Sequence, residues 1–195
     1  MDISKEKPNC PLVRFAGFTD AWEQRKLKDL SDSLEYGLNA PATEFDGKNQ
    51  YLRITDIDES THMFLKRDLS SPKTDLAVAQ DYLLREGDIL FARTGASVGK
   101  TYKYRENDGR VYYAGFLIRA RIKSEYDSEF VFQNTLTYRY QKYISVTSRR
   151  SGQPGVNAEE YSAFEIRVPS SSEQHRIGEI LSTFDRSIVL HQREC

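Results

Sequence analysis

Short segments in which hydrophobic and polar residues alternate dominate the first two thirds of the chain. Residues 51–57 (YLRITDI) and 116–123 (FLIRARIK) follow this period of two, with Phe116 among the hydrophobic positions of the second segment. A period of two predicts β-strands that bury one face. Residues 88–93 (DILFAR) predict a shorter strand, and residues 101–113 predict two strands joined around the turn residues NDG.

The last third of the chain changes to a helical period. Hydrophobic residues recur at intervals of three or four over residues 128–144, which predicts one amphipathic helix. Glycine and proline then indicate a loop at residues 148–156. Asn157 and Glu160 have the spacing of a capping box, and residues 164–168 (FEIRV) predict a further strand.

Residues 171–195 predict a helix whose hydrophobic seam repeats about every 3.5 residues, the spacing of paired helices. The seam consists of Ile177, Leu181, Phe184 and Ile188. An amphipathic helix alone in water is marginally stable, and no other predicted helix matches its length. We therefore expect an α+β fold with two parts: a mixed, mostly antiparallel β-rich domain over residues 1–170, and a helix over residues 171–195 that packs against a partner.

The composition is that of a globular domain with a hydrophobic core, because 38% of the 195 residues are hydrophobic and 12% are aromatic. No hydrophobic run reaches the roughly 20 residues needed to span a bilayer, and the N-terminal residues lack the pattern of a secretory signal. We expect a cytoplasmic location without membrane contact. Cys10 and Cys195 have no metal-ligand spacing and are expected to remain thiols.

The distribution of charge says more than its sum. The 28 basic and 29 acidic residues give a net charge of -1, yet residues 131–158 contain no Asp or Glu. That stretch holds three tyrosines, at 138, 140 and 143, and the cations Arg139, Lys142, Arg149 and Arg150. A run of charge is usually a solvated face, but this mixture of aromatic and basic residues favours contact with a polyanion.

The segment ILFARTGASVGKT, residues 89–101, is similar to a phosphate-binding loop. That pattern needs four residues between its first glycine and the Gly-Lys-Thr, and Gly95 lies one position too late. A phosphate-binding loop also opens a helix, whereas the residues after Lys100 alternate like a strand. A turn that needs Gly95 and Gly99 for its backbone geometry is the plain alternative, but it leaves the nearby cations unexplained.

No other pattern in the sequence indicates catalysis. The three histidines, His62, His175 and His191, have no metal-binding spacing, and no nucleophile elbow is present. Asp56 and Asp58 could form a carboxylate pair, but an acid at a strand end that caps a turn is the simpler interpretation. We expect that the chain is not an enzyme and has no metal site.

Five segments occur in an order that resembles the specificity subunits of type I restriction-modification systems. They are PLVRFAGFTDAWEQRKL, YLRITDI, REGDILFARTGASVGK, SGQPGVNAEEYSAFEIRVPS and EQHRIGEILSTFDRSIVLHQ, and together they cover nearly the whole chain. The resemblance implies a target-recognition domain that reads one half of a split double-stranded DNA site. It also implies helices that set the spacing between two such domains and bind methyltransferase subunits, through which restriction subunits join.

The resemblance further implies that S-adenosylmethionine and ATP belong to partner subunits, so that this chain needs no cofactor. Such subunits carry two recognition domains, whereas this sequence has one, followed by the start of a spacer helix. It is either a natural half subunit or a truncated form. As a half subunit it is expected to form a homodimer through the helix residues Ile177, Leu181, Phe184 and Ile188.

The candidate DNA-binding residues lie in the two glycine-containing loops, where arginine and lysine can approach a duplex closely. They are Arg93, Thr94, Lys100, Lys103, Arg149, Arg150, Ser151 and Gln153. Two alternatives remain open. The chain could compete with a full-length specificity subunit for methyltransferase, or, less favoured, bind a nucleotide at the glycine turn.

The spacing of the glycine turn leads to a first prediction. The protein should show no saturable ATP binding and no ATP hydrolysis, because Gly95 lies one position too late for a phosphate-binding loop and a strand follows Lys100. Lys100→Ala should instead weaken the affinity for DNA. Equilibrium titration with labelled ATP and with labelled duplex measures both properties, and ATP binding that Lys100→Ala abolishes would contradict the prediction.

Overall fold

The computed structural model describes residues 11, 13–149 and 152–194, with the backbone alone described for residues 189–194. Its strands are β1 (Glu23–Lys26), β2 (Ser31–Tyr36), β3 (Ala42–Glu44), β4 (Asn49–Leu52), β5 (Ser70–Pro72), β6 (Ile89–Ala92), β7 (Thr101–Lys103), β8 (Arg110–Tyr113), β9 (Leu117–Ile122) and β10 (Glu165–Val168). Its α-helices are α1 (Leu27–Leu30), α2 (Ser128–Asn134), α3 (Tyr138–Thr147), α4 (Ala158–Ser162) and α5 (Ser171–Glu194). Short 3-10 helices are η1 (Ile54–Asp56), η2 (Gln80–Tyr82), η3 (Gly95–Ser97) and η4 (Glu106–Asp108).

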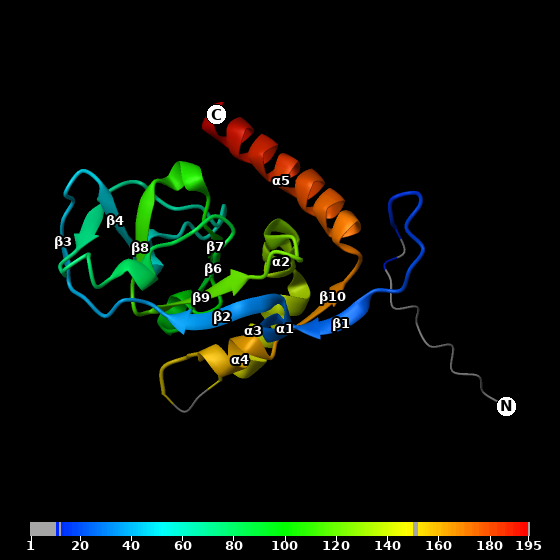
Figure 1. The fold of residues 1–195 in the computed structure, drawn as a ribbon, viewed down its shortest axis with the longest axis horizontal. Helices are drawn as coiled ribbons and strands as arrows, with labels where there is room; N and C mark the ends of the chain where they lie inside the picture. Colours follow the sequence, from blue (N-terminus) through cyan, green and yellow to red (C-terminus); the bar gives the residue numbers. More distant parts are fainter. Residues whose placement is uncertain (1–10, 12, 150–151, 195) are drawn as a thin grey trace.

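The central sheet is antiparallel and has the strand order β2-β9-β6-β7. Three strand pairs surround it: β1 with β10 and β3 with β5 are antiparallel, and β4 with β8 is parallel. The β1 and β10 pair brings residues 23–26 beside residues 165–168, close to the two ends of the β-rich domain (Figure 1). The expected α+β fold with a mostly antiparallel sheet and a C-terminal helix is therefore confirmed.

Both faces of the central sheet are buried at β6 and β7 and along the first four residues of β9, whereas β2 is mostly exposed or half-buried. One face, which includes Phe91 and Ile118, packs with residues of α2, α3 and α4 into the larger hydrophobic core. The other face, which includes Leu90 and Leu117, packs against β4 and β8. Figure 1 shows β3, β4 and β8 at the left of the molecule, and α2 with the pair of β1 and β10 to the right of them. The strand predictions for residues 88–93 and 164–168 are confirmed by β6 and β10.

Three details of the strand predictions were wrong. In β9 the second face is also buried, with Leu117 at 0% and Arg119 at 2% exposure, because β4 and β8 cover it. The strands β7 and β8 do not pair with each other, because β7 pairs with β6 and β8 with β4. The segment 51–57 leaves the strand after Leu52 and turns into η1, where the Asp56 carboxylate accepts from the Arg53 amide, as the turn-capping interpretation expected.

The predicted helix over residues 128–144 is two helices, α2 and α3. The chain breaks between them because Thr137 forms a new N-cap, with its hydroxyl accepting from the Tyr140 amide at 3.3 Å. Asp127 caps α2 in the same way, accepting from the Phe130 amide at 2.8 Å. The capping box of Asn157 and Glu160 is confirmed at the start of α4.

The turn between β6 and β7 depends on Gly99, which leads to a second prediction. Gly99 has φ +84°, and a Cβ added there would lie 2.6 Å from Cγ2 of Ile144 in α3. Gly47 has nearly the same φ, +83°, but nothing lies within 4 Å of its added Cβ. Gly47→Ala should therefore cost only the left-handed backbone strain of about 1 kcal/mol, whereas Gly99→Ala should cost about 2–4 kcal/mol. Urea unfolding measures both free energies, and equal losses would contradict a tight contact at Ile144.

Candidate DNA-binding surface

The two glycine-containing loops of the sequence lie side by side. The backbone of Thr94 pairs with that of Gly155, the Gly95 amide donates to the Pro154 carbonyl at 3.0 Å, and the Val156 amide donates to the Arg93 carbonyl at 2.9 Å. A Cβ added to Gly95 would lie 3.1 Å from Nε2 of Gln153, so this side chain lies directly over the first loop. The segments 93–100 and 152–156 therefore form one surface, and the Gly155 amide donates to the carbonyl of Ser148, next to Arg149, at 3.3 Å. We name this surface, together with Arg149, the paired-loop surface.

Buried tyrosines hold the turn that begins this surface. The Tyr140 hydroxyl donates to the Gly99 carbonyl at 3.0 Å, and the Tyr161 hydroxyl accepts from the Gly99 amide and donates to the Ala92 carbonyl at 2.7 Å. Burial raises the pKa of both phenols above the ordinary value. The hydroxyls therefore keep their protons at neutral pH and continue to donate to the turn.

Arg93 is a cation whose donors remain available. Its guanidinium carbon lies 4.9 Å from the centre of the Tyr36 ring, a cation-π arrangement. Its side chain has no hydrogen bond or ion pair with any described residue, and its Nε is buried without a partner. Burying an N–H group without an acceptor costs free energy, and a planar guanidinium recognises two acceptors at once. The structure thus orients Arg93 over Tyr36, and no described residue accepts hydrogen bonds from its terminal nitrogens.

The other candidate residues of the surface differ in their surroundings. Lys100 donates to the Ile57 carbonyl at 3.1 Å, which uses one of the three ammonium protons. Arg149 is exposed at the end of α3, with Nε donating to the Ser145 carbonyl at 2.9 Å. Gln153 is exposed, and Thr94 is half-buried. Together with Arg93, these side chains present cations and an amide group at the surface. Among the described residues, no ion pair joins Arg93, Lys100 or Arg149 to a carboxylate.

Several residues that the sequence associated with DNA contact are buried or half-buried in the structure. Lys103 is only 8% exposed, and its ammonium lies 3.0 Å from a Glu129 oxygen of α2, so we do not include it in the paired-loop surface. Tyr140 is 2% exposed in the core and Tyr143 is half-buried against it. Arg150 and Ser151 lie outside the described residues.

Sequence reasoning missed two aromatic residues of the surface. Tyr36 supports Arg93, and its hydroxyl accepts from the Ala158 amide at 3.2 Å. Phe116 was predicted on a buried strand face, but it is 57% exposed, because it lies in the turn before β9 and packs into none of the hydrophobic cores. The alternation in the sequence gives the face of a residue correctly, but it does not show where the covering layer ends.

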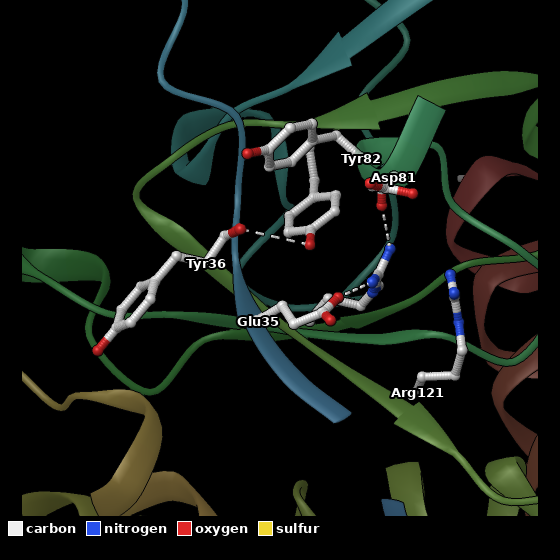
Figure 2. A pocket seen from close by; sticks show the side chains of 7 residues that line it. Glu35, Tyr36, Asp81, Tyr82 and Arg121 are labelled. Carbon is white, nitrogen blue, oxygen red and sulfur yellow. Dashed lines mark hydrogen bonds and ion pairs between the residues drawn. The ribbon is translucent and has the colours of Figure 1, made fainter. Parts of the chain in front are cut away.

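A polar cavity of about 330 Å³ lies on the opposite face of the sheet (Figure 2). Arg119 fills its base, pairing with the Glu35 carboxylate and donating to the Asp81 carbonyl at 2.7 Å. Its guanidinium also lies 5.2 Å from the centre of the Tyr113 ring. The ring of Tyr36 points away from Glu35 and Arg121, and toward the side on which Arg93 stacks. Tyr36 therefore lies between the two: it lines the cavity, and its ring lies against Arg93 of the paired-loop surface.

The geometry opposes a nucleotide site at the glycine turn. Lys100 is followed by β7, which runs antiparallel to β6, so the turn does not open a helix as a phosphate-binding loop does. Within the described ranges there is no cluster of three His, Cys, Asp or Glu side chains that could hold a metal ion. No described helix is long and hydrophobic enough to cross a membrane.

The first turns of α5 are fixed to the β-rich domain. The Glu173 carboxylate is 1% exposed and pairs with Arg14 at 2.6 Å, and Gln174 accepts from the Asp127 amide at 3.1 Å. A Cβ added to Gly178 would lie 2.8 Å from Oδ1 of Asp127, which shows how closely α5 approaches the start of α2. Ile177 packs against the larger core.

The rest of the hydrophobic seam on α5 is exposed. The exposed fractions are 37% for Leu181, 61% for Phe184 and 56% for Ile188, and Ile180, which lies beside the seam, is 42% exposed. Figure 1 shows this part of the helix continuing past α2, toward the side of the molecule where β7 and β8 lie. Of the four predicted seam residues, Ile177 therefore belongs to the core, and the other three form a surface.

This chain belongs to the family of type I restriction modification DNA specificity domains, whose sequence model matches residues 19–194. The family is the non-catalytic specificity component, and the sequence expectation that the chain is not an enzyme is confirmed by this membership.

Individual relatives agree with this assignment. Over 187 residues the chain is 26% identical to a Methanocaldococcus jannaschii protein whose name describes it as the MjaX specificity subunit of a type I restriction enzyme. Its fold is similar to the S subunit of a type I restriction-modification system from M. genitalium, with a TM-score of 0.61 and 19% identity over 93% of this chain. It is also similar to the HsdS subunit of Thermoanaerobacter tengcongensis, with a TM-score of 0.63 and 16% identity over 94% of this chain.

The chain spans less than half the length of these relatives. It covers 44% of the Methanocaldococcus protein, 42% of the M. genitalium subunit and 46% of the Thermoanaerobacter subunit. The match therefore concerns one recognition domain with its helix.

Proposed function

We propose that this chain is a sequence-specific DNA-recognition module of a type I restriction-modification enzyme. It reads one half of a two-part duplex target through a recognition domain over residues 1–170. The helix over residues 171–195 contributes to spacing and to the binding of methyltransferase subunits, through which restriction subunits join. Family membership supports this role, and S-adenosylmethionine and ATP would bind to the partner subunits.

Arg93 is the observation that carries the proposal. Its guanidinium is held over Tyr36, and its side-chain donors have no partner among the described residues. Guanine presents two acceptors, O6 and N7, at the spacing that an arginine fork recognises, whereas a phosphate supplies charge without sequence information. We assign the base contact to Arg93 and adenine recognition to Gln153. Arg149 and Lys100 are assigned to phosphates, and Thr94 to positioning of the backbone; Arg150 and Ser151 belong to the same loop in the sequence.

The exposed seam of α5 supports a homodimer. Leu181, Phe184 and Ile188 form a hydrophobic surface with no described neighbour to cover it. Two copies that align α5 antiparallel about a two-fold axis would bury this seam and place two recognition domains on one duplex. Such a dimer would read two identical half-targets in inverted orientation.

The same seam supports a second candidate function. If α5 binds methyltransferase without a second recognition domain, the chain would compete with a full-length specificity subunit and lower restriction activity. DNA binding by the purified chain separates the two functions, because a competitor does not need the paired-loop surface.

The paired-loop surface leads to a third prediction. Arg149→Ala should flatten the plot of log affinity against log salt by about one unit and leave the preferred sequence unchanged. Arg93→Ala should cost about 1–3 kcal/mol and relax the preference at one base pair, and Arg93→Lys should restore the salt slope but not the preference. Fluorescence anisotropy on a duplex selected from a random pool measures each effect.

Arg25→Ala provides the matched control, because it removes an arginine of β1 that pairs with Glu23 outside this surface. It should leave both slope and sequence preference at the level of the parent protein. Equal behaviour of all three alanine variants would rule out the paired-loop surface as the DNA-binding site. Unchanged thermal unfolding excludes a trivial loss of structure.

The dimer leads to a fourth prediction. The parent protein should dimerise at about tens of micromolar, the range of weak association, and Phe184→Asp should be monomeric. Val78→Asp is the control, because Val78 is 76% exposed on the recognition domain and lies outside the seam. Sedimentation equilibrium gives the masses. A parent protein that stays monomeric up to about 100 micromolar, or a Val78→Asp variant that dissociates equally, would remove the basis for the seam as the dimer interface.

A further inference from the structure

We infer that Phe116 is a specificity-determining residue that contacts the 5-methyl group of a thymine in the major groove. This inference rests on the proposed function and adds a second base contact to that of Arg93. Its starting point is exposure: among the described phenylalanines only Phe116 and Phe184 are exposed, and Phe184 belongs to the seam of α5. Phe116 is 57% exposed and contributes to none of the hydrophobic cores.

The backbone that carries Phe116 is fixed. The Leu117 amide donates to the Ala114 carbonyl at 2.9 Å and closes a turn around Gly115 and Phe116. The Gly37 amide donates to the Leu117 carbonyl at 3.0 Å, and a Cβ added to Gly37 would lie 2.1 Å from the Ala114 carbonyl oxygen. The turn is thus packed against the chain that follows β2, and only the side-chain torsions of Phe116 lose freedom on binding.

Phe116 lies beside Arg93 on the same face of the sheet. The Arg93 amide donates to the Phe116 carbonyl at 3.1 Å, and the register of β6 with β9, Ala92 opposite Leu117, places Arg93 opposite Phe116. Side chains opposite each other on antiparallel strands start about 5 Å apart. Successive bases of one strand are about 3.4 Å apart, so one side chain over a guanine brings the other over an adjoining base.

The chemistry of this neighbourhood favours a base edge over a protein partner. The nearest functional side chain is a cation with unused donors, and Gln153 and Thr94 lie on the joined loop. In the major groove a phenyl ring finds one hydrophobic group, the thymine methyl, while the arginine finds the guanine acceptors. The pair therefore reads a guanine with an adjoining thymine.

Removing the methyl group from the DNA tests this contact directly. The duplex selected by the parent protein is prepared in a series in which each thymine in turn is replaced by deoxyuracil, which pairs identically but lacks the methyl group. Replacement at one position should weaken binding by the parent about fourfold, the value of one buried methyl group. Phe116→Ala should bind the thymine duplex more weakly by at least the same factor and should not respond to deoxyuracil at that position.

Two further variants make the result unambiguous. Phe116→Leu keeps a hydrophobic side chain on the turn and should retain part of the response to deoxyuracil, even if alanine perturbs the fold. Val78→Ala removes an exposed hydrophobic side chain elsewhere and should behave like the parent protein. Thermal unfolding of each variant confirms that the domain is intact.

The contrary outcomes are distinct. The inference would be overturned if Phe116→Ala kept the affinity, the selected sequence and the deoxyuracil response of the parent protein. The proposed function would still stand if Arg93→Ala lost affinity for the duplex in the same assay. Weaker binding without dependence on any single methyl group, together with bent DNA in the complex, would overturn it in favour of a side chain inserted between bases. If the parent protein selects no sequence, the proposed function itself fails.

Discussion

The end of β6 is hydrogen-bonded on every side, and the candidate site depends on this constraint. The Ala92 amide donates to the Lys100 carbonyl, and the Ala92 carbonyl accepts from the Gly99 amide and the Tyr161 hydroxyl. One residue later, Arg93 bonds to Phe116 on one side and Val156 on the other. Buried backbone groups need partners, so the chain cannot leave β6 in another direction without losing several hydrogen bonds at once. The hydrophobic core thereby fixes the direction of a surface arginine.

Much of the fold could be predicted from the sequence because it depends on local patterns. Buried strands such as β6, the capping box of α4 and the long helix α5 each have a signal within a few residues. The break before α3 has only a weak local signal, since Thr137 interrupts a hydrophobic period that continues on both sides. The separate pairing of β7 and β8 has none, because it depends on β6 and β4, which lie elsewhere in the chain.

The candidate site divides in the same way. Glycine and arginine within a turn indicate a surface loop, but only the order of the sheet brings residues 93–100 to residues 152–156. Lys100 and Lys103 look alike in the sequence, yet Lys103 meets Glu129 of α2 and is buried, whereas Lys100 reaches only a carbonyl. In the sequence, Tyr140 is an aromatic residue within a basic segment. In the structure it is part of the core, where its hydroxyl donates to the Gly99 carbonyl. Residue type gives the chemistry of a side chain, and tertiary contacts decide whether that chemistry is available.

The packing of α5 couples the proposed DNA reader to the proposed spacer. Gly178 permits the helix to approach Asp127 and Phe130 so closely that a side chain larger than hydrogen would meet both, and Glu173 is buried against Arg14. The division proposed after residue 170 is therefore not a hinge, because the first turns of α5 pack as part of the recognition domain. A helix rises 1.5 Å per residue, so two rigid domains joined through paired helices would stand at a distance set by helix length. DNA with a different spacing between half-targets would have to twist or bend to reach both paired-loop surfaces, and that deformation costs free energy. In the proposed arrangement, stiffness would recognise the spacing, and the side chains that the end of β6 holds in place would recognise the bases.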